Sequence, residues 1–302
     1  MTITIPANGI DVEISHPDKV LFPKDGITKA DVAGYYQKIS KTILPYLQDR
    51  PISMQRFPDG IEVEGFFQKE VPKYFPDWIG RSSVEVKEDG QTQDQVVCQN
   101  EAALLYLANL GCITLHRWLS RSDKLDQPDL MIFDLDPPRD DFEPVRFAAQ
   151  RLHDFFRENE IDSHVMTTGS RGLHVLVPLD RAASFDEVRD TAEEIARHLA
   201  QRYPQRLTTE IRKEKRENRL FLDTMRNAYA QTAVTPYALR ALPGAPVATP
   251  LDWDELQDRD LRARSFHMEN IFRRLGQKSD PWRDIARHAQ SLKSIRKSLN
   301  DM

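Results

Sequence analysis

The sequence predicts a protein of the α/β (α+β) class, in which helices and short strands alternate along 302 residues. Four segments repeat apolar residues at helical spacing, namely residues 28–47, 100–110, 144–156 and 184–203. Three of these segments open on a capping residue, because Thr28 and Ser184 begin capping boxes and Asn100 is a good N-cap. Short apolar runs that stop at Gly, Pro or Asp lie between the helices, as is typical of buried strands.

Composition indicates a water-soluble protein with a sizeable core. Hydrophobic residues make up 40% of the chain, which is enough for one large domain or two smaller ones. The formal net charge of −5 argues against wholesale binding to nucleic acid but allows a local basic face. Cys98 and Cys112 are too few for a zinc knuckle or a disulfide framework. Without a signal peptide or a long apolar run, the chain is expected to be cytoplasmic and to avoid membranes.

The N-terminal part places two lysines around the first helix. A strand is predicted at residues 12–15, and a proline-rich loop with Lys19 follows it. Lys29 lies at the start of the helix. Spacing alone favours two ordinary solvated lysines here.

A strand that ends near Arg56 leads to two adjacent aromatic residues, Phe66 and Phe67, and then to Lys69. Adjacent residues of an extended segment face opposite ways, so at least one ring is exposed unless both sides are buried. An exposed ring beside a cation is a stacking platform for a nucleic-acid base, and burial of both rings in the core is the alternative.

Lys87 in Lys-Glu-Asp-Gly resembles the nucleophile motif of nucleotidyl-transferring ligases. The Asp-Gly pair also makes a good hairpin turn between the predicted strands 84–86 and 95–97, and the other motifs of such ligases are lacking, so a hairpin is favoured. Farther on, an apolar strand at 112–115 leads to His116 at its end. A lone histidine there is more often structural than a ligand.

The segment Leu130–Pro138 carries the strongest chemical signal. Four apolar residues run into Asp134 and Asp136, and two prolines then stop the segment, which predicts a buried strand that ends at a mouth. Residues two apart on a strand share a face, so both carboxylates lie together. Such a pair is unfavourable unless cations neutralise it, which indicates a site for two divalent metals. A pair of solvated turn acids is the alternative.

The segment from Thr168 to Pro178 resembles a cradle for phosphate groups. Gly169 and Gly172 allow close turns of the backbone. Donors converge there from three side chains, those of Ser170, Arg171 and His174. An ordinary glycine-serine hairpin without a ligand remains the alternative.

A basic run at residues 211–219 precedes an apolar strand that ends at Asp223. Asp223 can complete a three-carboxylate site with Asp134 and Asp136, while nearby positive charge comes from Lys213, Arg216 and Arg219. Arg226 and Arg240 can reach toward a polyphosphate. This inventory fits nucleotidyl transfer with two metal ions, in which no separate nucleophilic side chain is needed.

The chain resembles the polymerase domain of bacterial and archaeal ligase D, a branch of the archaeo-eukaryotic primase superfamily that works in non-homologous end joining. The resemblance rests on ordered motifs along nearly the whole chain: Asp18-Lys-Val-Leu-Phe-Pro, Thr28-Lys, Tyr35-Tyr36, Arg50-Pro51, Arg56-Phe-Pro-Asp-Gly, Phe66-Phe-Gln-Lys, Phe133-Asp-Leu-Asp-Pro, Gly169-Ser-Arg-Gly-Leu-His and Phe221-Leu-Asp.

The resemblance implies one domain over residues 1–302, a primase-polymerase module of mixed β-sheets flanked by helices in a single globule. The catalytic core would span about 100–242, with DNA-end-binding elements at about 10–70 and a C-terminal strap and helices at about 243–302.

The resemblance also implies roles for individual residues. Asp134, Asp136 and Asp223 would bind two Mn²⁺ or Mg²⁺ ions and be catalytic. The phosphates of an incoming NTP or dNTP, with ribonucleotides preferred, would contact Ser170, Arg171, Gly172, His174, Arg226 and Arg240. Lys19 and Lys29 would grip the 5′-phosphate of a downstream strand, and Phe66 and Phe67 would stack on template bases. Further DNA contacts would come from Arg56, Lys69, His116, Lys213 and Arg216.

The expected function is therefore a template-dependent polymerase or primase that extends 3′-OH ends at gaps or breaks. Expected partners are gapped or broken DNA, a separate ligase, a phosphoesterase and the end-binding protein Ku. Two departures from the family stand out: Asn218 replaces a frequent Gly, and no ligase or phosphoesterase domain is attached, so a stand-alone polymerase or an excised domain is expected.

Three alternatives compete with this function. One is a non-catalytic module that bridges DNA ends, although the intact carboxylates argue against it. A primase in replication or damage tolerance is another. The third is an Asp-x-Asp phosphohydrolase with Asp134 as nucleophile, but that family expects Thr or Val two residues after the second acid, and Pro137-Pro138 follow here.

Overall fold

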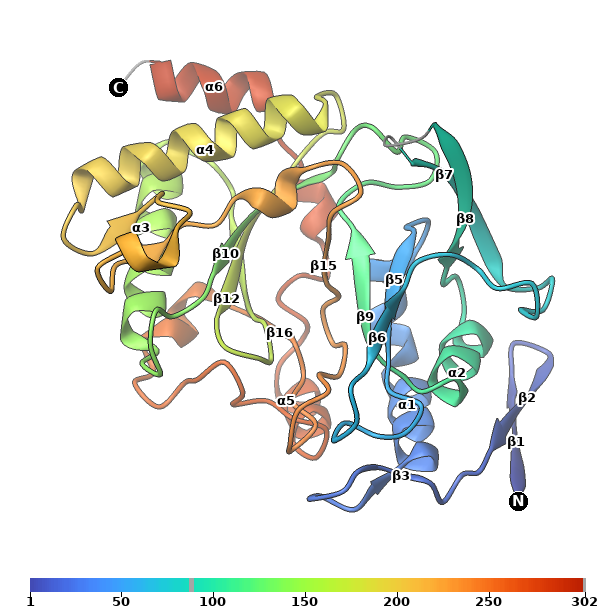
Figure 1. Ribbon diagram of the computed structural model, residues 1–302. Coiled ribbons are helices and arrows are strands. Elements are labelled where there is room, and N and C mark those ends of the chain that lie inside the picture. The colour runs from blue at the N-terminus through green and yellow to red at the C-terminus, as the bar shows by residue number, and fades with distance from the viewer. Residues whose placement is uncertain (87–89, 301–302) are drawn as a thin grey trace. The chain divides into compact units, whose positions relative to one another are not determined.

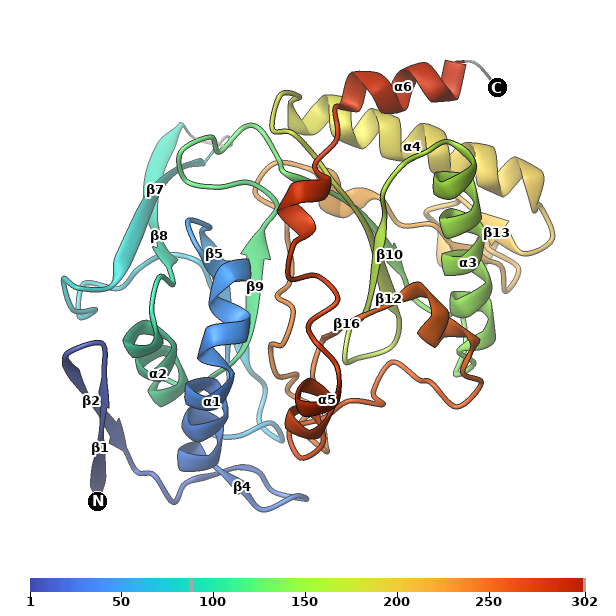
Figure 2. The same ribbon diagram turned by 180° about the vertical axis from the view of Figure 1, so that it is seen from behind.

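The computed structural model describes residues 1–86 and 90–300, which fold into two compact units. The first unit comprises residues 1–123, 232–248 and 266–274. The second comprises residues 124–231, 249–265 and 275 to the C-terminus. Figures 1 and 2 show the helices and short strands of both units from opposite sides. The predicted mixed α/β class is confirmed. Among the described helices, none is long and apolar enough to span a membrane.

The first unit contains a four-stranded antiparallel sheet in the order β15-β9-β5-β6. Its strands are β5 (Ile52–Arg56), β6 (Phe66–Gln68), β9 (Cys112–Trp118) and β15 (Thr232–Val234). Three hairpins accompany the sheet: β1 (Thr2–Ala7) with β2 (Ile10–Ser15), β3 (Val20–Phe22) with β4 (Ile27–Thr28), and β7 (Gly80–Val86) with β8 (Gln91–Val97). The pairing of β7 with β8 confirms the predicted hairpin, and Lys87 lies outside the described residues.

Two helices complete the core of this unit. Helix α1 (Lys29–Leu47) begins at the capping box that Thr28 forms with Asp31, as predicted. It buries Tyr35 and Tyr36, whose hydroxyls donate to the carbonyls of Tyr237 and Ile113. Helix α2 (Glu101–Asn109) is capped by Asn100 and packs against α1. Helix α5 (Ile271–Gln277) crosses the division between the units.

The second unit is organised around an antiparallel sheet in the order β10-β12-β11-β16. Its strands are β10 (Leu130–Leu135), β11 (His164–Thr167), β12 (Leu173–Pro178) and β16 (Thr249–Leu251). Because β10 and β11 both pair antiparallel with β12, they run in the same direction, and helix α3 (Glu143–Glu158) is the crossover between them. Residues 136–163, which include α3, are long enough for such a crossover.

Helices and short segments surround this sheet. Helix α4 (Phe185–Arg202), which begins at the predicted capping box of Ser184 and Glu187, contacts β10, and α6 (Leu292–Asn300) contacts α4 (Figure 2). Strands β13 (Leu207–Thr208) and β14 (Leu220–Phe221) pair in parallel. Four 3₁₀ turns complete the unit: η1 (Lys213–Lys215), η2 (Met225–Asn227), η3 (Trp253–Gln257) and η4 (Ile285–His288).

Several predicted boundaries need correction. His116 does not end a strand, because β9 continues to Trp118 between two paired neighbours, β5 and β15. The strand expected up to Asp223 stops at Phe221, and Asp223 forms an isolated bridge instead. The strap after residue 243 contributes β16 to the sheet. The expected core at about 100–242 includes residues of both units, and the one-domain organisation stays a prediction.

Candidate functional site

Three carboxylates meet at the end of β10 in the second unit. The Asp134 N–H donates to the carbonyl of Asp223 over 2.9 Å, so a backbone bridge joins two residues far apart in sequence. Asp136 follows directly after β10. The side chains of Asp134, Asp136 and Asp223 line one hollow of about 420 Å³, which we call the carboxylate hollow. The predicted grouping of the three acids is present in the structure.

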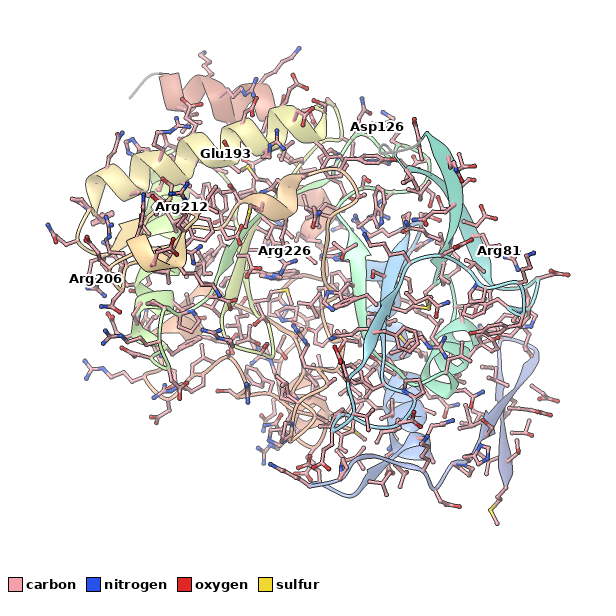
Figure 3. All side chains as sticks on the ribbon, in the orientation of Figure 1. Arg81, Asp126, Glu193, Arg206, Arg212 and Arg226 are labelled. Atoms are coloured by element: carbon pink, nitrogen blue, oxygen red, sulfur yellow. The ribbon has the colours of Figure 1, made fainter. Side chains whose placement is uncertain are left out.

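Asp134 is buried, with 8% of its surface exposed, and two side chains hold it, a guanidinium and an imidazole. Its Oδ2 accepts from Nε of Arg226 at 2.6 Å, and its Oδ1 lies 3.4 Å from Nε2 of His174 (Figure 3 shows Arg226 beside β10). Burial by itself would raise the pKa of Asp134, but the charges and hydrogen bonds of His174 and Arg226 outweigh it and lower that pKa. Asp134 is therefore anionic at any physiological pH. Because Asp134 is buried, the alternative of a pair of solvated turn acids is wrong for this residue.

The other two carboxylates have the opposite electrostatics. Removal of water by the surrounding protein, followed by the charge of Asp134, raises the pKa of Asp136, although its side chain reaches solvent. Burial and the charge of Asp134 also raise the pKa of Asp223. A hydrogen bond from the Met225 N–H to Asp223 lowers this pKa, but it does not outweigh the other two effects. Negative charge is thus under-compensated at this end of the hollow.

Carboxylate oxygens are the ligands that Mg²⁺ and Mn²⁺ prefer, so the donor chemistry fits the predicted metals. Within the described residues, no three His, Cys, Asp or Glu side chains are arranged to hold an ion. The oxygens of Asp134 face Arg226 and His174, so an ion that binds Asp134 would compete with Arg226. Metal binding stays a prediction.

The hairpin between β11 and β12 lies against the end of β10. Thr168 organises this turn, because its Oγ1 accepts from the N–H groups of Ser170 and Gly172, at 3.3 and 3.2 Å. Gly169 has φ +65°, a conformation that favours glycine. A Cβ at Gly172 would lie 1.8 Å from the carbonyl oxygen of Leu135, so only glycine allows this approach.

Two further contacts fix the hairpin next to the carboxylates. Nη2 of Arg171 donates to the carbonyl of Pro137 over 2.8 Å. His174 lies directly opposite Asp134 in the register of β12 with β10. The predicted nucleotide-binding residues Ser170, Arg171, Gly172 and His174 are therefore next to the predicted metal ligands. Sequence reasoning gave Thr168 no role; a Thr that precedes Gly-Ser-Arg-Gly is the signal that indicates such a turn.

The basic run supplies one rim of the carboxylate hollow, which Lys213, Arg216 and Arg219 line. Arg216 is half-buried, donates to the carbonyls of Glu210 and Ile211, and stacks its guanidinium 4.0 Å from the centre of the Phe221 ring. Asn218, the residue noted above as a departure from the family pattern, has φ +64°, a left-handed conformation that Asn tolerates.

The remaining candidates belong to the first unit. The Lys29 side chain is buried, and burial followed by the charge of Lys19 lowers its pKa. The expectation of an ordinary solvated lysine is wrong for Lys29, because the capped start of α1 turns it inward, where Nζ lies 3.5 Å from Oγ of Ser15. Lys19 forms an exposed ion pair with Asp59 at 2.7 Å. Arg240 also lies in this unit, and its backbone N–H donates to the carbonyl of Pro246.

The aromatic pair lies on β6, the edge strand of its sheet, and both rings are exposed, Phe66 by 47% and Phe67 by 59%. The Arg56 guanidinium lies 5.3 Å from the centre of the Phe66 ring, and His116 meets Phe67 edge to face at 5.4 Å. Lys69 follows the strand and is exposed. The alternative in which both rings are buried is wrong, because no further strand covers this edge in the described residues.

Comparison with known proteins decides the family. The family model described as "LigD, primase-polymerase domain" matches residues 28–282. The chain belongs to this family. The family that the sequence motifs predicted is therefore confirmed.

Named relatives agree with this assignment. The chain is 31% identical to the multifunctional non-homologous end joining protein LigD of Mycolicibacterium smegmatis, over 89% of this chain and 35% of the relative. It is 32% identical to the bifunctional non-homologous end joining protein LigD of Bacillus subtilis, over 90% of this chain and 44% of the relative. The chain therefore spans less than half the length of these relatives.

A solved structure supports the same family. The polymerase domain of Mycobacterium tuberculosis ligase D, in complex with DNA, matches with a TM-score of 0.84 and 26% identity. The match covers 92% of this LigD primase-polymerase chain and 98% of that chain.

Proposed function

We propose that this chain is a template-dependent nucleotidyltransferase, a DNA-directed polymerase or primase that extends 3′-OH ends at gaps and double-strand breaks in non-homologous end joining. The observation that carries the proposal is the meeting of Asp134, Asp136 and Asp223 in one hollow beside the Thr168–Gly172 hairpin. Clustered carboxylates next to anion-binding donors are what nucleotidyl transfer requires. Family membership and the DNA complex of the M. tuberculosis relative support it.

We also propose that the carboxylate hollow holds two divalent cations, Mn²⁺ or Mg²⁺, through Asp134, Asp136 and Asp223. When bound, such ions activate the attacking hydroxyl and stabilise charge on the leaving oxygen. The protein contributes a carboxylate that is already ionised, because Arg226 and His174 keep the pKa of Asp134 low. It also contributes a fixed geometry, because the Asp134–Asp223 backbone bridge and the contact at Gly172 hold both segments in place.

The substrate in this proposal is an NTP or dNTP, with ribonucleotides preferred as the family resemblance implies. Its triphosphate would contact Ser170, Arg171 and His174. Guanidinium and hydroxyl donors suit phosphate oxygens, and charge-assisted hydrogen bonds of this kind are the strong ones. The leaving group is pyrophosphate.

The DNA contacts of the proposal fall in the first unit. Lys29 is a buried cation whose pKa the nearby Lys19 lowers further, and a bound anion such as a 5′-phosphate would relieve that repulsion. The exposed rings of Phe66 and Phe67 offer faces on which template bases can stack, worth about 1–3 kcal/mol per base. A filled gap still has to be sealed, so we propose that a ligase, a phosphoesterase and Ku act on the same ends.

The test is primer extension on a duplex with a short gap, with Mn²⁺, NTPs or dNTPs, and a downstream strand with or without a 5′-phosphate. We expect extension that follows the template, is faster with NTPs, and is stimulated by the phosphate. Lys29→Met with Lys19→Ala should remove the stimulation, while Lys24→Ala, an exposed lysine in the following loop, should keep it. Tight gap binding without extension would instead indicate a non-catalytic end-bridging module.

A further inference from the structure

A second hollow in the same unit shares only Ser170 and Arg171 with the nucleotide contacts proposed above, and the rest of its lining has no role in that function. It has a volume of about 600 Å³, and four arginines line it, namely Arg139, Arg171, Arg262 and Arg264. We call it the arginine hollow. Arg171 and Pro137 line the carboxylate hollow as well, so the two hollows are neighbours. The four arginines come from three separate segments of the chain.

The guanidinium groups of this hollow are not neutralised by carboxylates. Arg171 and Arg264 each donate to one backbone carbonyl, that of Pro137 and that of Ser170. Arg262 donates to the carbonyls of Arg259 and Leu261. Arg139 makes no hydrogen bond or ion pair with any residue in the described part of the chain.

Two acids also line the hollow without pairing to its arginines. Asp141 accepts a hydrogen bond from the N–H of Glu143 at the start of α3. Neither Asp140 nor Asp141 lies within ion-pair distance of the four guanidinium groups among the described residues. The excess of positive charge therefore faces solvent in a concave place, where it attracts anions.

Arginine presents its N–H donors in a planar fork that matches two oxygens of a phosphate group. We propose that the arginine hollow is an accessory binding site for phosphate-bearing anions, next to the carboxylate hollow but separate from it. Two sources could fill it: the pyrophosphate released by nucleotidyl transfer, or the phosphodiesters of a DNA strand. The Nε of Arg264 donates to the carbonyl of Ser170 in the turn between β11 and β12. An anion that binds Arg264 would therefore contact a residue that holds this hairpin in place.

The first experiment measures pyrophosphate binding by isothermal titration calorimetry, without DNA, nucleotide or divalent metal. The variant is Arg139→Gln with Arg262→Gln, which leaves Ser170, Arg171 and Arg264 intact. The matched control is Arg197→Gln, because Arg197 is an exposed arginine on α4 without an ion pair in the described residues. If pyrophosphate fills the hollow, the double variant should bind it at least about tenfold more weakly than the wild type, and the control should not.

The second experiment measures the salt dependence of gapped-duplex binding by fluorescence anisotropy. The logarithm of the binding constant falls linearly with the logarithm of the salt concentration, and each lost contact with a duplex phosphate makes this negative slope less steep by about 0.9. A slope reduced by about two in the double variant assigns the hollow to a DNA strand. An unchanged slope with weaker pyrophosphate binding assigns it to the leaving anion.

A double variant that matches the wild type in both measurements would overturn the proposal, as would an equal loss in Arg197→Gln. Neither measurement requires catalysis. Failure of the proposed polymerase activity and failure of this anion site are therefore distinguishable.

Discussion

Asp134 is the most constrained carboxylate of the site, since one of its oxygens meets the guanidinium of Arg226 and the other the imidazole of His174. A carboxyl whose pKa is lowered by folding stabilises the folded state at all pH values above its ordinary pKa. That stabilisation is lost as the pH falls through the lowered folded pKa. Near neutral pH this stabilisation is fully present. Removing Arg226 therefore measures how much the Asp134–Arg226 ion pair contributes to the free energy of unfolding.

We predict that Arg226→Gln destabilises the protein by about 1–3 kcal/mol at pH 7, because a buried anion loses its closest partner while Arg226 itself is partly exposed. Urea unfolding in the presence of EDTA measures this. Adding Asp134→Asn should recover part of the loss, since the uncompensated charge is then absent. An undiminished penalty for Arg226→Gln in the Asp134→Asn background would show that the ion pair is not its cause.

Asp136 and Asp223 behave in the opposite way, because their pKa values are raised in the folded state. In the absence of metal, the folded protein holds protons on these groups more tightly than the unfolded chain does. Their ionisation therefore opposes folding at neutral pH, and this cost disappears as the pH falls below their raised pKa values.

We predict that Asp136→Asn raises the melting temperature of the metal-free protein at pH 7. Mn²⁺ should raise the melting temperature of the wild type, since a ligand of the folded state stabilises it, and should raise that of Asp136→Asn less. Differential scanning fluorimetry with EDTA or Mn²⁺ gives both results. Equal Mn²⁺ shifts in the two proteins would place metal binding elsewhere.

At the scale of elements, the hairpin between β11 and β12 packs directly against the end of β10. Gly172 allows their contact, since any Cβ there would collide with the Leu135 carbonyl. The Thr168 side chain satisfies two N–H groups of the turn. The position of Asp136 is thus set by a backbone contact from another strand.

We predict that Gly172→Ala lowers both stability and nucleotidyl transfer, the former by about 1–3 kcal/mol because the strand end must shift. Gly34→Ala is the matched control. A Cβ at Gly34 in α1 meets nothing within 4 Å, so this change should stabilise the protein by roughly 0.5–1 kcal/mol. Urea unfolding and primer extension on both variants check this, and wild-type behaviour of Gly172→Ala would refute the contact.

The elements that sequence predicts best are those with local signals. Thr28 and Ser184 mark the starts of α1 and α4 because a capping box is complete within four residues. Strand β1 is missed although Thr2–Ile5 alternates polar and apolar residues, which is a local strand signal. Strand β3 is missed because its three residues are too few to show a pattern. His116 is misplaced at a strand end because the pairing of β9 with β5 and β15, which extends the strand, is not visible locally.

At the scale of the molecule, the carboxylate site could be predicted only in part. Strand ends that carry acids predicted the meeting of Asp134 with Asp223, and the backbone bridge between them confirms it. The Arg226 ion pair could not be predicted, because the folded chain decides whether that arginine meets a phosphate or a carboxylate. The arginine hollow was also missed, since its residues converge only through folding.

Net charge gives little guidance to these local sites. The chain carries 42 basic and 47 acidic residues, yet cations cluster around the carboxylate hollow and the arginine hollow. Binding to DNA should therefore weaken steeply with salt despite the overall negative charge.

The most direct test of the central claim is Mn²⁺-dependent extension of a gapped duplex by the wild type and by Asp136→Asn. Asp190→Asn, which removes an exposed carboxylate from α4, is the control for a lost charge. We predict a loss of at least about 100-fold in Asp136→Asn, unchanged DNA binding, and normal extension by the control. Extension by Asp136→Asn at the wild-type rate would contradict the assignment of this hollow as the catalytic centre.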